Sequence, residues 1–195
     1  MKKKHEHIIE SVRPGSIAEE LGIEYYDKEI ITEISKHTSL SEEYIKQVIE
    51  CKPHHLYPIT IGQSFAYNDN YAFQQVQSVY SSQCQIMREM AVKAPCVMIG
   101  RCADYILQEF KPYRIFVYAD MESRIKRCIE RSSEEEKVGE KEMKSLINNF
   151  DKSRAKYYEF YTGMKWGDKK NYDLCVNTTD VVIKEIVPVI AKLFR

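Results

Sequence analysis

The stretch CVMIGRCADY, residues 96–105, decides the fold class of this chain. It opens with a continuous apolar run of the length of a buried strand, then turns at a glycine that is followed by an arginine. Two similar runs, RIFVYA at 114–119 and LCVNT at 174–178, are separated from it by amphipathic segments. Apolar strands that alternate with helices predict an α/β fold, a three-layer parallel sheet with helices on both faces.

The remaining segments are consistent with this alternation. EYY at 24–26 and HIIES at 7–11 are candidates for shorter strands. Apolar periodicity predicts helices at 28–37, 41–49, 71–93, 103–110, 121–131, 140–161 and 180–194, and a short helix from 16 to 21. Thr179 or Asp180 is the expected cap of the last helix.

Composition narrows the function classes. The chain has 195 residues, which suits one domain over 1–195, and its 29 Lys and Arg balance 29 Asp and Glu. Zero net charge argues against a general nucleic-acid binder. No apolar run approaches the ~18 residues of a membrane span, and the basic start lacks a signal-peptide core.

Cysteine and histidine usage indicates neither a disulfide framework nor a metal site. The six cysteines contain no Cys-x-x-Cys pair, and most lie in apolar runs, as small buried hydrophobic residues do. His54 and His55 lie beside prolines in a loop-like stretch, where paired histidines are usually surface residues. We therefore expect a reducing, cytoplasmic location and no metal ligands.

Arg101 is the first candidate site residue, because it stands at the carboxyl end of a predicted buried strand. Ligands of open α/β sheets bind at that edge, and a guanidinium there can fork onto a phosphate or carboxylate. The alternative is a structural pair between Arg101 and Asp104. Spacing alone does not separate the two interpretations.

Three arginines recur on one face of the predicted helix 121–131. Arg124, Arg127 and Arg131 are three and then four residues apart, so their like charges lie close together. An anion would neutralise them. The alternative is a solvated face that Glu122 and Glu130 balance.

The helix 140–161 carries a charged residue in an apolar seam. The seam consists of Met143, Ile147, Phe150, Tyr157 and Tyr161, and Arg154 occupies its missing position. Asp151 lies one turn before Arg154 and is its candidate ion-pair partner. We favour the alternative that both residues face a cleft and hold a bound anion and its neighbouring hydroxyl or amine.

Four motifs, in this order along the chain, resemble the cytidylate-kinase-like family of P-loop kinases. They are YYDKEII, APCVMIGRCADYIL, FDKSRAKYYEFYTGMKWGD and NYDLCVNTT, and the resemblance runs from about residue 22 to the C-terminus. It implies a P-loop kinase fold with a helical lid at roughly 128–162. It also implies transfer of the γ-phosphate of ATP, assisted by Mg²⁺, to a nucleoside monophosphate or similar small acceptor.

The resemblance also implies roles for particular residues. The acceptor site would contain Tyr26, Asp27, Arg101, Asp104, Asp151 and Arg154. Arg127 and Arg131 would be catalytic lid arginines near the transferred group. Arg13, Gly15 and Ser16 would be what remains of the ATP phosphate site.

The N-terminal region departs from the family pattern. No Gly-x-x-x-x-Gly-Lys-Ser/Thr sequence is present, and only six residues, 16–21, are available for the first helix. They span about 9 Å as helix, whereas a crossover with its helix needs at least about 10–12 residues. We expect a tight turn and a short helix, which cannot enclose a triphosphate.

Three explanations of this departure remain open. The chain is a degenerate kinase that binds nucleotide weakly or not at all, or it lacks a segment that an intact parent enzyme has, or its MKKKHEH start pairs differently and the phosphate site is rebuilt. The expected function is therefore an impaired phosphotransferase, with a non-catalytic nucleotide- or anion-binding regulatory module as the alternative. The family name suggests CMP as acceptor, but neither the acceptor nor the oligomeric state follows from the sequence.

Overall fold

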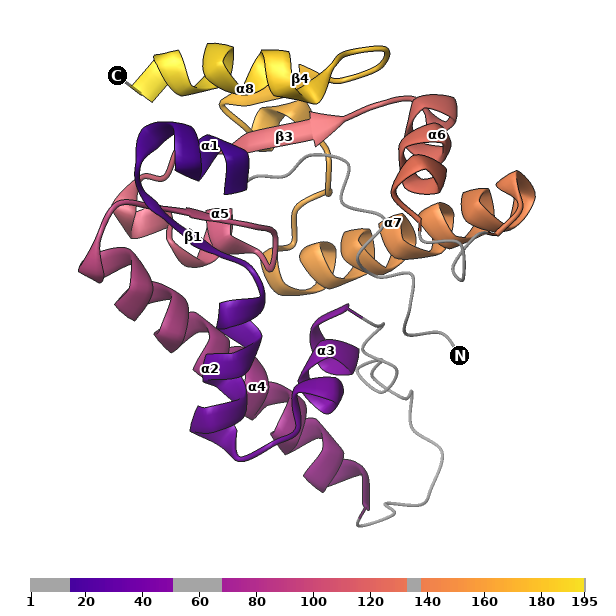
Figure 1. The fold of residues 1–195 in the computed structure, drawn as a ribbon. Helices are drawn as coiled ribbons and strands as arrows, with labels where there is room; N and C mark the ends of the chain where they lie inside the picture. Colours follow the sequence, from indigo (N-terminus) through magenta and orange to yellow (C-terminus); the bar gives the residue numbers. More distant parts are fainter. Residues whose placement is uncertain (1–14, 51–67, 133–137, 195) are drawn as a thin grey trace.

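The computed structural model describes residues 15–50, 68–132 and 138–194 (Figure 1). The helices are α1 (Gly15–Leu21), α2 (Lys28–Thr38), α3 (Glu42–Glu50), α4 (Asn68–Lys93), α5 (Ala103–Ile106), α6 (Met121–Arg131), α7 (Glu140–Thr162) and α8 (Ile183–Ala191). The strands are β1 (Glu24–Tyr26), β2 (Cys96–Met98), β3 (Ile115–Tyr118) and β4 (Leu174–Asn177). The expected strand at 7–11, His54, His55 and Arg13 lie outside the described residues.

The four strands form two parallel pairs. β1 pairs with β2, with Tyr26 opposite Met98, and β3 pairs with β4, with Tyr118 opposite Asn177. The prediction of parallel strands joined through helices is confirmed. Within the described ranges the strands make two two-stranded sheets and not one continuous sheet.

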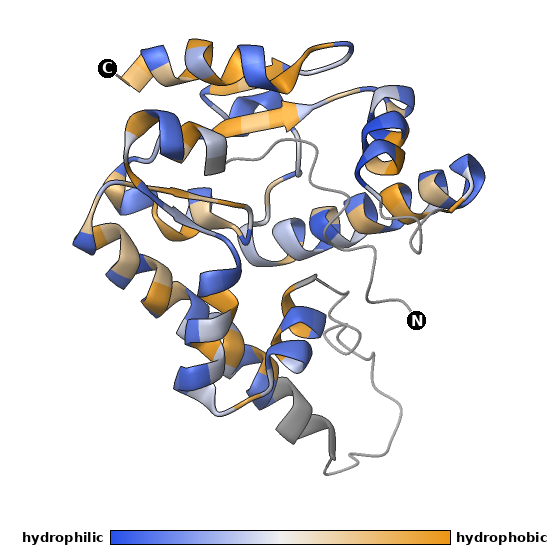
Figure 2. Cartoon of the chain, viewed as in Figure 1, coloured by the Kyte–Doolittle hydropathy of each residue, from blue (hydrophilic) through white to orange (hydrophobic). Residues whose placement is uncertain are grey.

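Helices pack on both faces of the β1–β2 pair and on one face of the β3–β4 pair. Alternate residues of a strand point to opposite faces. Val97, Val117 and Val176 accordingly lie in a cluster with Ile17 of α1 and Val187 and Ile190 of α8. Tyr26 and Met98 point the other way, into a cluster with α2, α4, α5 and α7. Figure 2 shows β3 as almost wholly hydrophobic; its last residue, Tyr118, is exposed.

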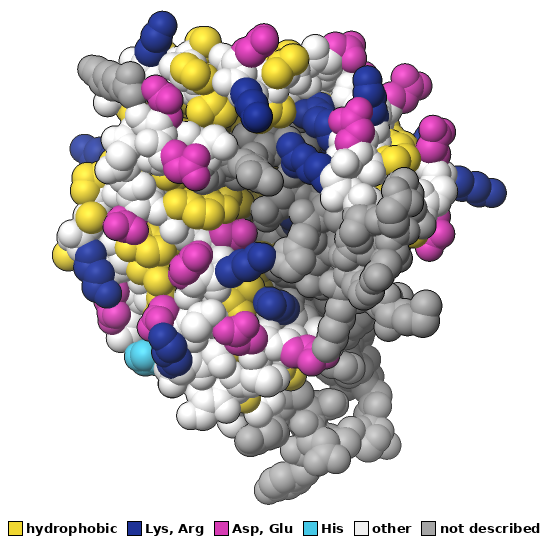
Figure 3. All heavy atoms as spheres, viewed as in Figure 1, with side chains coloured by type: hydrophobic (Ala, Val, Ile, Leu, Met, Phe, Trp, Pro, Cys, Tyr) yellow, Lys and Arg dark blue, Asp and Glu magenta, His cyan; other side chains and the backbone are white. Residues whose placement is uncertain are grey.

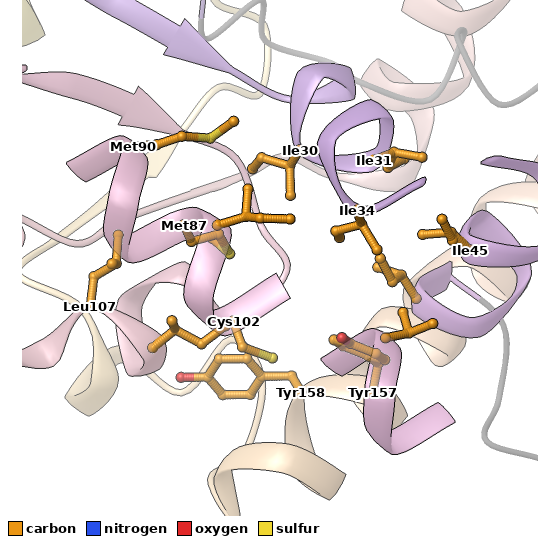
Figure 4. Close-up of a cluster of buried hydrophobic side chains, with 14 residues drawn as sticks. Ile30, Ile31, Ile34, Ile45, Met87, Met90, Cys102, Leu107, Tyr157 and Tyr158 are labelled. Atoms are coloured by element: carbon orange, nitrogen blue, oxygen red, sulfur yellow. The ribbon is translucent and has the colours of Figure 1, made fainter. Parts of the chain in front are cut away.

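The main hydrophobic core lies on the side of α2, α3 and α4 (Figure 4). Ile30, Ile31 and Ile34 from α2, Ile45 from α3 and Met87 from α4 are at most 1% exposed. A second, smaller cluster joins α6 to the first half of α7. Helix α7 therefore belongs to both clusters, through different residues. None of the helices in the described ranges is long and apolar enough to cross a membrane.

Among the helix boundaries that differ from the predictions, two have a local explanation. α8 begins at Ile183 and not at 180, because Asp180 has a φ of 53° and the Val181 amide donates to the Thr178 carbonyl in a turn. Neither Thr179 nor Asp180 therefore caps α8. The helix predicted at 103–110 ends at Ile106 and continues as a short 3-10 helix, Gln108–Phe110.

Candidate active site

A buried ion pair stands at the carboxyl ends of β1 and β2. Asp27 follows β1 directly, and Arg101 lies three residues after β2. Because these strands are parallel neighbours, their carboxyl ends meet, and Arg101 Nη1 lies 2.7 Å from Asp27 Oδ1. The two side chains are only 10% and 11% exposed. The structure thus brings two predicted acceptor-site residues together at the predicted strand edge.

The Arg101 guanidinium forms hydrogen bonds through Nη1 but not through Nε. Nη1 donates to Asp27 and also to the Ile99 carbonyl, at 3.1 Å. Nε is buried without a hydrogen-bond partner, the only such side-chain nitrogen or oxygen among the described residues. A buried donor without a partner is costly, and a guanidinium edge matches two oxygens of a phosphate or carboxylate. The Nε edge of Arg101 is therefore chemically suited to an anion.

The backbone around Arg101 is unusual. Gly100, Arg101 and Cys102 have φ angles of 59°, 51° and 58°. Left-handed conformations are common for glycine but rare for other residues, and runs of them persist only where surrounding contacts enforce them. The first turn of α5 supplies part of this support, because the Ala103 amide donates to the Gly100 carbonyl at 2.9 Å.

Asp104 is hydrogen-bonded to Tyr158 and not to Arg101, the partner considered from the sequence. Arg101 pairs with Asp27, so the alternative of a structural Arg101–Asp104 pair is wrong. Asp104 Oδ2 instead accepts a 2.6 Å hydrogen bond from the Tyr158 hydroxyl of α7. Burial, and then this hydrogen bond, raise the pKa of Tyr158, so the hydroxyl stays a donor.

Asp151 pairs with Arg124 of α6 and not with Arg154. The two side chains form a bidentate contact of 2.7 and 2.8 Å between α6 and α7. Arg154 is exposed, so its interpretation as a buried residue of the seam is wrong. The reason is that α7 changes neighbours: Ile147 packs against α6, Tyr157 enters the main core, and Arg154 lies between the two contacts.

Arg127 joins α6 to the end of β4. Its Nη2 and Nη1 donate to the carbonyl and hydroxyl of Thr178, at 2.9 and 3.2 Å, and Thr178 follows β4 directly. Burial, with a further contribution from the nearby charge of Arg131, lowers the pKa of Arg127. Arg131 itself is exposed at the end of α6. The alternative of a face balanced by Glu122 and Glu130 fails for Arg124, which pairs with Asp151, and for Arg127, which donates to Thr178 and the Ser123 carbonyl.

The N-terminal helix is as short as the sequence predicts. α1 has seven residues from Gly15 to Leu21, and Ser16 is half-buried in its first turn. Ile17 and Leu21 pack it against α8 and the strands. In the described part of the chain no group of three His, Cys, Asp or Glu side chains could hold a metal ion.

Tyr26 faces a different region from Asp27. Its ring packs on the main core and lines a groove of about 500 Å³ between α2 and α4, with Glu29 and Met90 among its neighbours. Burial raises the pKa of Tyr26. Acidic and basic side chains are interspersed over the face seen in Figure 3.

Sequence reasoning missed two residues beside the site. Gln83 donates a hydrogen bond to the Arg101 carbonyl, and Thr178 accepts hydrogen bonds from the Arg127 guanidinium. Gln83 lies four residues after Val79 and four before Met87 on the buried face of α4. A polar residue inside an apolar seam was the signal that could have found it.

Parallel strands between helices, with a buried arginine at their carboxyl edge, define an α/β protein with a site suited to an anion. A family model described as the cytidylate kinase-like family matches residues 15–180, and the chain belongs to this family. A crystal structure of an uncharacterized protein from Eubacterium ventriosum ATCC 27560 is similar, with a TM-score of 0.65 and 27% sequence identity. The match covers 97% of this chain and 91% of that one. A comparison with curated proteins gives no match.

Proposed function

We propose that this chain is a cytidylate-kinase-like phosphotransferase for a nucleoside monophosphate or similar small acceptor, with turnover impaired by its short phosphate loop. The observation that carries the proposal is the Nε edge of Arg101, a buried guanidinium edge without a partner at the carboxyl ends of β1 and β2. Family membership supplies the reaction class. Phosphoryl transfer depends on positioning and charge neutralisation, which arginines can provide.

Asp27 and the four predicted arginines of the described chain have a place in this proposal. Arg101 receives the acceptor phosphate, and Asp27 fixes the opposite edge of its guanidinium. Arg154, exposed on α7, approaches the same acceptor. Arg131 belongs to a helical lid at 128–162, and Arg127 lies directly before this lid, within a single cytoplasmic domain. We further propose one three-layer parallel sheet of the P-loop kinase type, because both strand pairs contribute to the cluster beneath α1 and α8.

The phosphate donor is less well supported than the acceptor. The family implies ATP and Mg²⁺, and Arg13, Gly15 and Ser16 are the residues proposed to contact the ATP phosphates. A seven-residue α1 offers few backbone amides, and the chain has no P-loop lysine motif, so the described residues fit a triphosphate poorly. We therefore assign no catalytic step to the donor.

A non-catalytic binding module is the second candidate, and a specific observation favours it. Arg101, Arg124 and Arg127 are each already bonded within the protein, to Asp27, Asp151 and Thr178. Arginines that internal partners hold in place are less available to follow a transferred phosphoryl group, which fits binding better than turnover. This module would bind a small nucleotide or anion and no nucleic acid.

A coupled assay of ADP release with CMP and other nucleoside monophosphates tests the proposal. We expect turnover well below the roughly 1–100 per second of ordinary kinases. Thermal unfolding separates the two candidates, because a ligand at 100 times its Kd adds about 2.7 kcal/mol of stability. Stabilisation by CMP without ADP release would favour the binding module, and ordinary kinase turnover would contradict the impaired phosphate loop.

A further inference from the structure

Gln83 is a buried polar residue with both ends of its amide satisfied. It lies in the middle of α4 with no exposed surface, among the apolar residues of the main core. Its Nε2 donates to the Arg101 carbonyl at 2.9 Å, and its Oε1 accepts from the Tyr157 hydroxyl at 3.1 Å. A carbonyl can only accept, so these partners fix the orientation of the amide.

The first of these bonds supports the unusual turn. Arg101 and Cys102 are non-glycine residues with φ angles of 51° and 58°. Such a conformation persists only when its surroundings enforce it. The Arg101 carbonyl, fixed to the core by Gln83, and the Arg101 side chain, fixed by Asp27, lie on either side of the same Cα atom. Gln83 thereby limits where the guanidinium can lie.

The second bond connects the turn to α7. Tyr157 is 5% exposed, and the adjacent Tyr158 is bonded to Asp104 in the segment after the turn. Figure 4 shows both tyrosine side chains in the core cluster, with Tyr158 beside Cys102. Two successive residues of α7 are thus bonded to neighbours of Arg101: Tyr157 to Gln83 and Tyr158 to Asp104. The same helix is bonded to α6 through Asp151 and Arg124.

We infer that Gln83 is a positioning residue for the anion site: it fixes the Arg101 turn and, through Tyr157, links that turn to α7. The inference rests on the proposed function in one respect, namely that Arg101 receives an anion. It goes beyond that function because Gln83 is wholly buried and its amide is bonded to protein groups at both ends. Its effect is transmitted through the Arg101 backbone.

The test measures CMP and inorganic phosphate binding by calorimetry in Gln83→Leu, which removes both hydrogen bonds. We expect Kd to rise roughly tenfold, since small misplacement of a binding group has large effects. Val79→Ala is the matched control, since it loosens the same buried face of α4 without touching the hydrogen bonds. It should leave Kd unchanged. Equal rises in Kd for the two variants would overturn the inference.

A double-mutant cycle with Arg101→Lys identifies the route of the effect. If Gln83 acts through Arg101, then adding Gln83→Leu to Arg101→Lys should weaken binding no further. Additive effects would show that Gln83 acts elsewhere. Tyr157→Phe, which removes only the bond to α7, should raise Kd less than Gln83→Leu does.

A second measurement keeps the inference independent of ligand binding. In ¹H–¹⁵N spectra of the free protein, Gln83→Leu should shift the amide signals of Arg101 and Cys102 and the Arg101 Nε–H signal, whereas Val79→Ala should not. Failure of the wild type to bind CMP or phosphate would defeat the proposed anion site alone. Unshifted turn signals in Gln83→Leu would defeat the positioning role, whether or not an anion binds.

Discussion

At the scale of single residues, the site depends on how one arginine is held. The Arg101 guanidinium has a carboxylate on one edge and a buried, unpartnered Nε on the other. A buried charge with an incomplete set of partners costs stability unless another group completes it. This arrangement explains why the residue can serve the structure of the free protein and still have an edge suited to an anion.

Asp27→Asn should lower the free energy of unfolding by about 3 kcal/mol, because removing one partner leaves the buried Arg101 charge uncompensated. Phosphate should recover part of this loss by supplying a counter-ion. Urea denaturation with and without phosphate measures both effects. Glu109→Gln is the control, since its ion pair with Arg88 has side chains 59% and 48% exposed. It should cost less than about 1 kcal/mol, and equal losses in the two variants would contradict the account.

The Arg114–Asp173 ion pair should make the free energy of unfolding depend on pH in acid. Hydrogen bonds from the Arg114 side chain and backbone lower the pKa of Asp173 from 3.8 to about 2. A carboxylate with a lower pKa in the folded state stabilises the protein above its unfolded pKa, and this stability is lost as pH falls through the folded pKa. Because both side chains are about one-third exposed, we expect a contribution of at most about 1 kcal/mol.

The measurement for this pair is the loss of unfolding free energy between about pH 4 and pH 2. Wild type should lose more over this range than Asp173→Asn, which cannot ionise. Identical pH dependence in the two proteins would show that the pair does not contribute.

At the scale of elements, α7 joins two hydrophobic clusters. Met143 and Ile147 pack against α6, whereas Tyr157 and Tyr158 lie in the main core. The 3.6-residue periodicity predicted the helix and three of its four buried residues, Met143, Ile147 and Tyr157, but not Tyr158. It did not predict that Arg154, at a seam position, is exposed, because periodicity does not tell which neighbour covers each turn.

Amide hydrogen exchange should proceed at different rates in the two parts of α7. We expect α6 and the first half of α7 to exchange faster than residues 157–162, because their cluster has few buried residues. Arg124→Met, which breaks the bidentate contact with Asp151, should accelerate exchange in α6 and the first half of α7 only. Uniform protection along α7 would contradict this division.

At the scale of the whole molecule, local sequence patterns predicted the helices and strands better than they predicted which side chains contact one another. The apolar runs at 96–98, 115–118 and 174–177 are parallel strands as expected, and the Asp27–Arg101 edge follows from their direction. The partners of Asp104, Asp151 and Arg127 were not predictable, since each is far away along the chain. The shortness of α1 was predictable from residue count alone.

The central claim is that Arg101 holds an anionic acceptor on a kinase-like fold. Calorimetry of CMP binding tests it most directly, with Arg101→Lys as the variant, since lysine keeps a positive charge beside Asp27 but cannot fork onto a phosphate. Arg88→Ala is the control, since Arg88 is exposed and bonded to Glu109. We predict one CMP per wild-type chain, unchanged binding in Arg88→Ala, and a Kd at least roughly tenfold higher in Arg101→Lys. Absence of CMP binding by the wild type, or equal affinity in Arg101→Lys, would contradict the account.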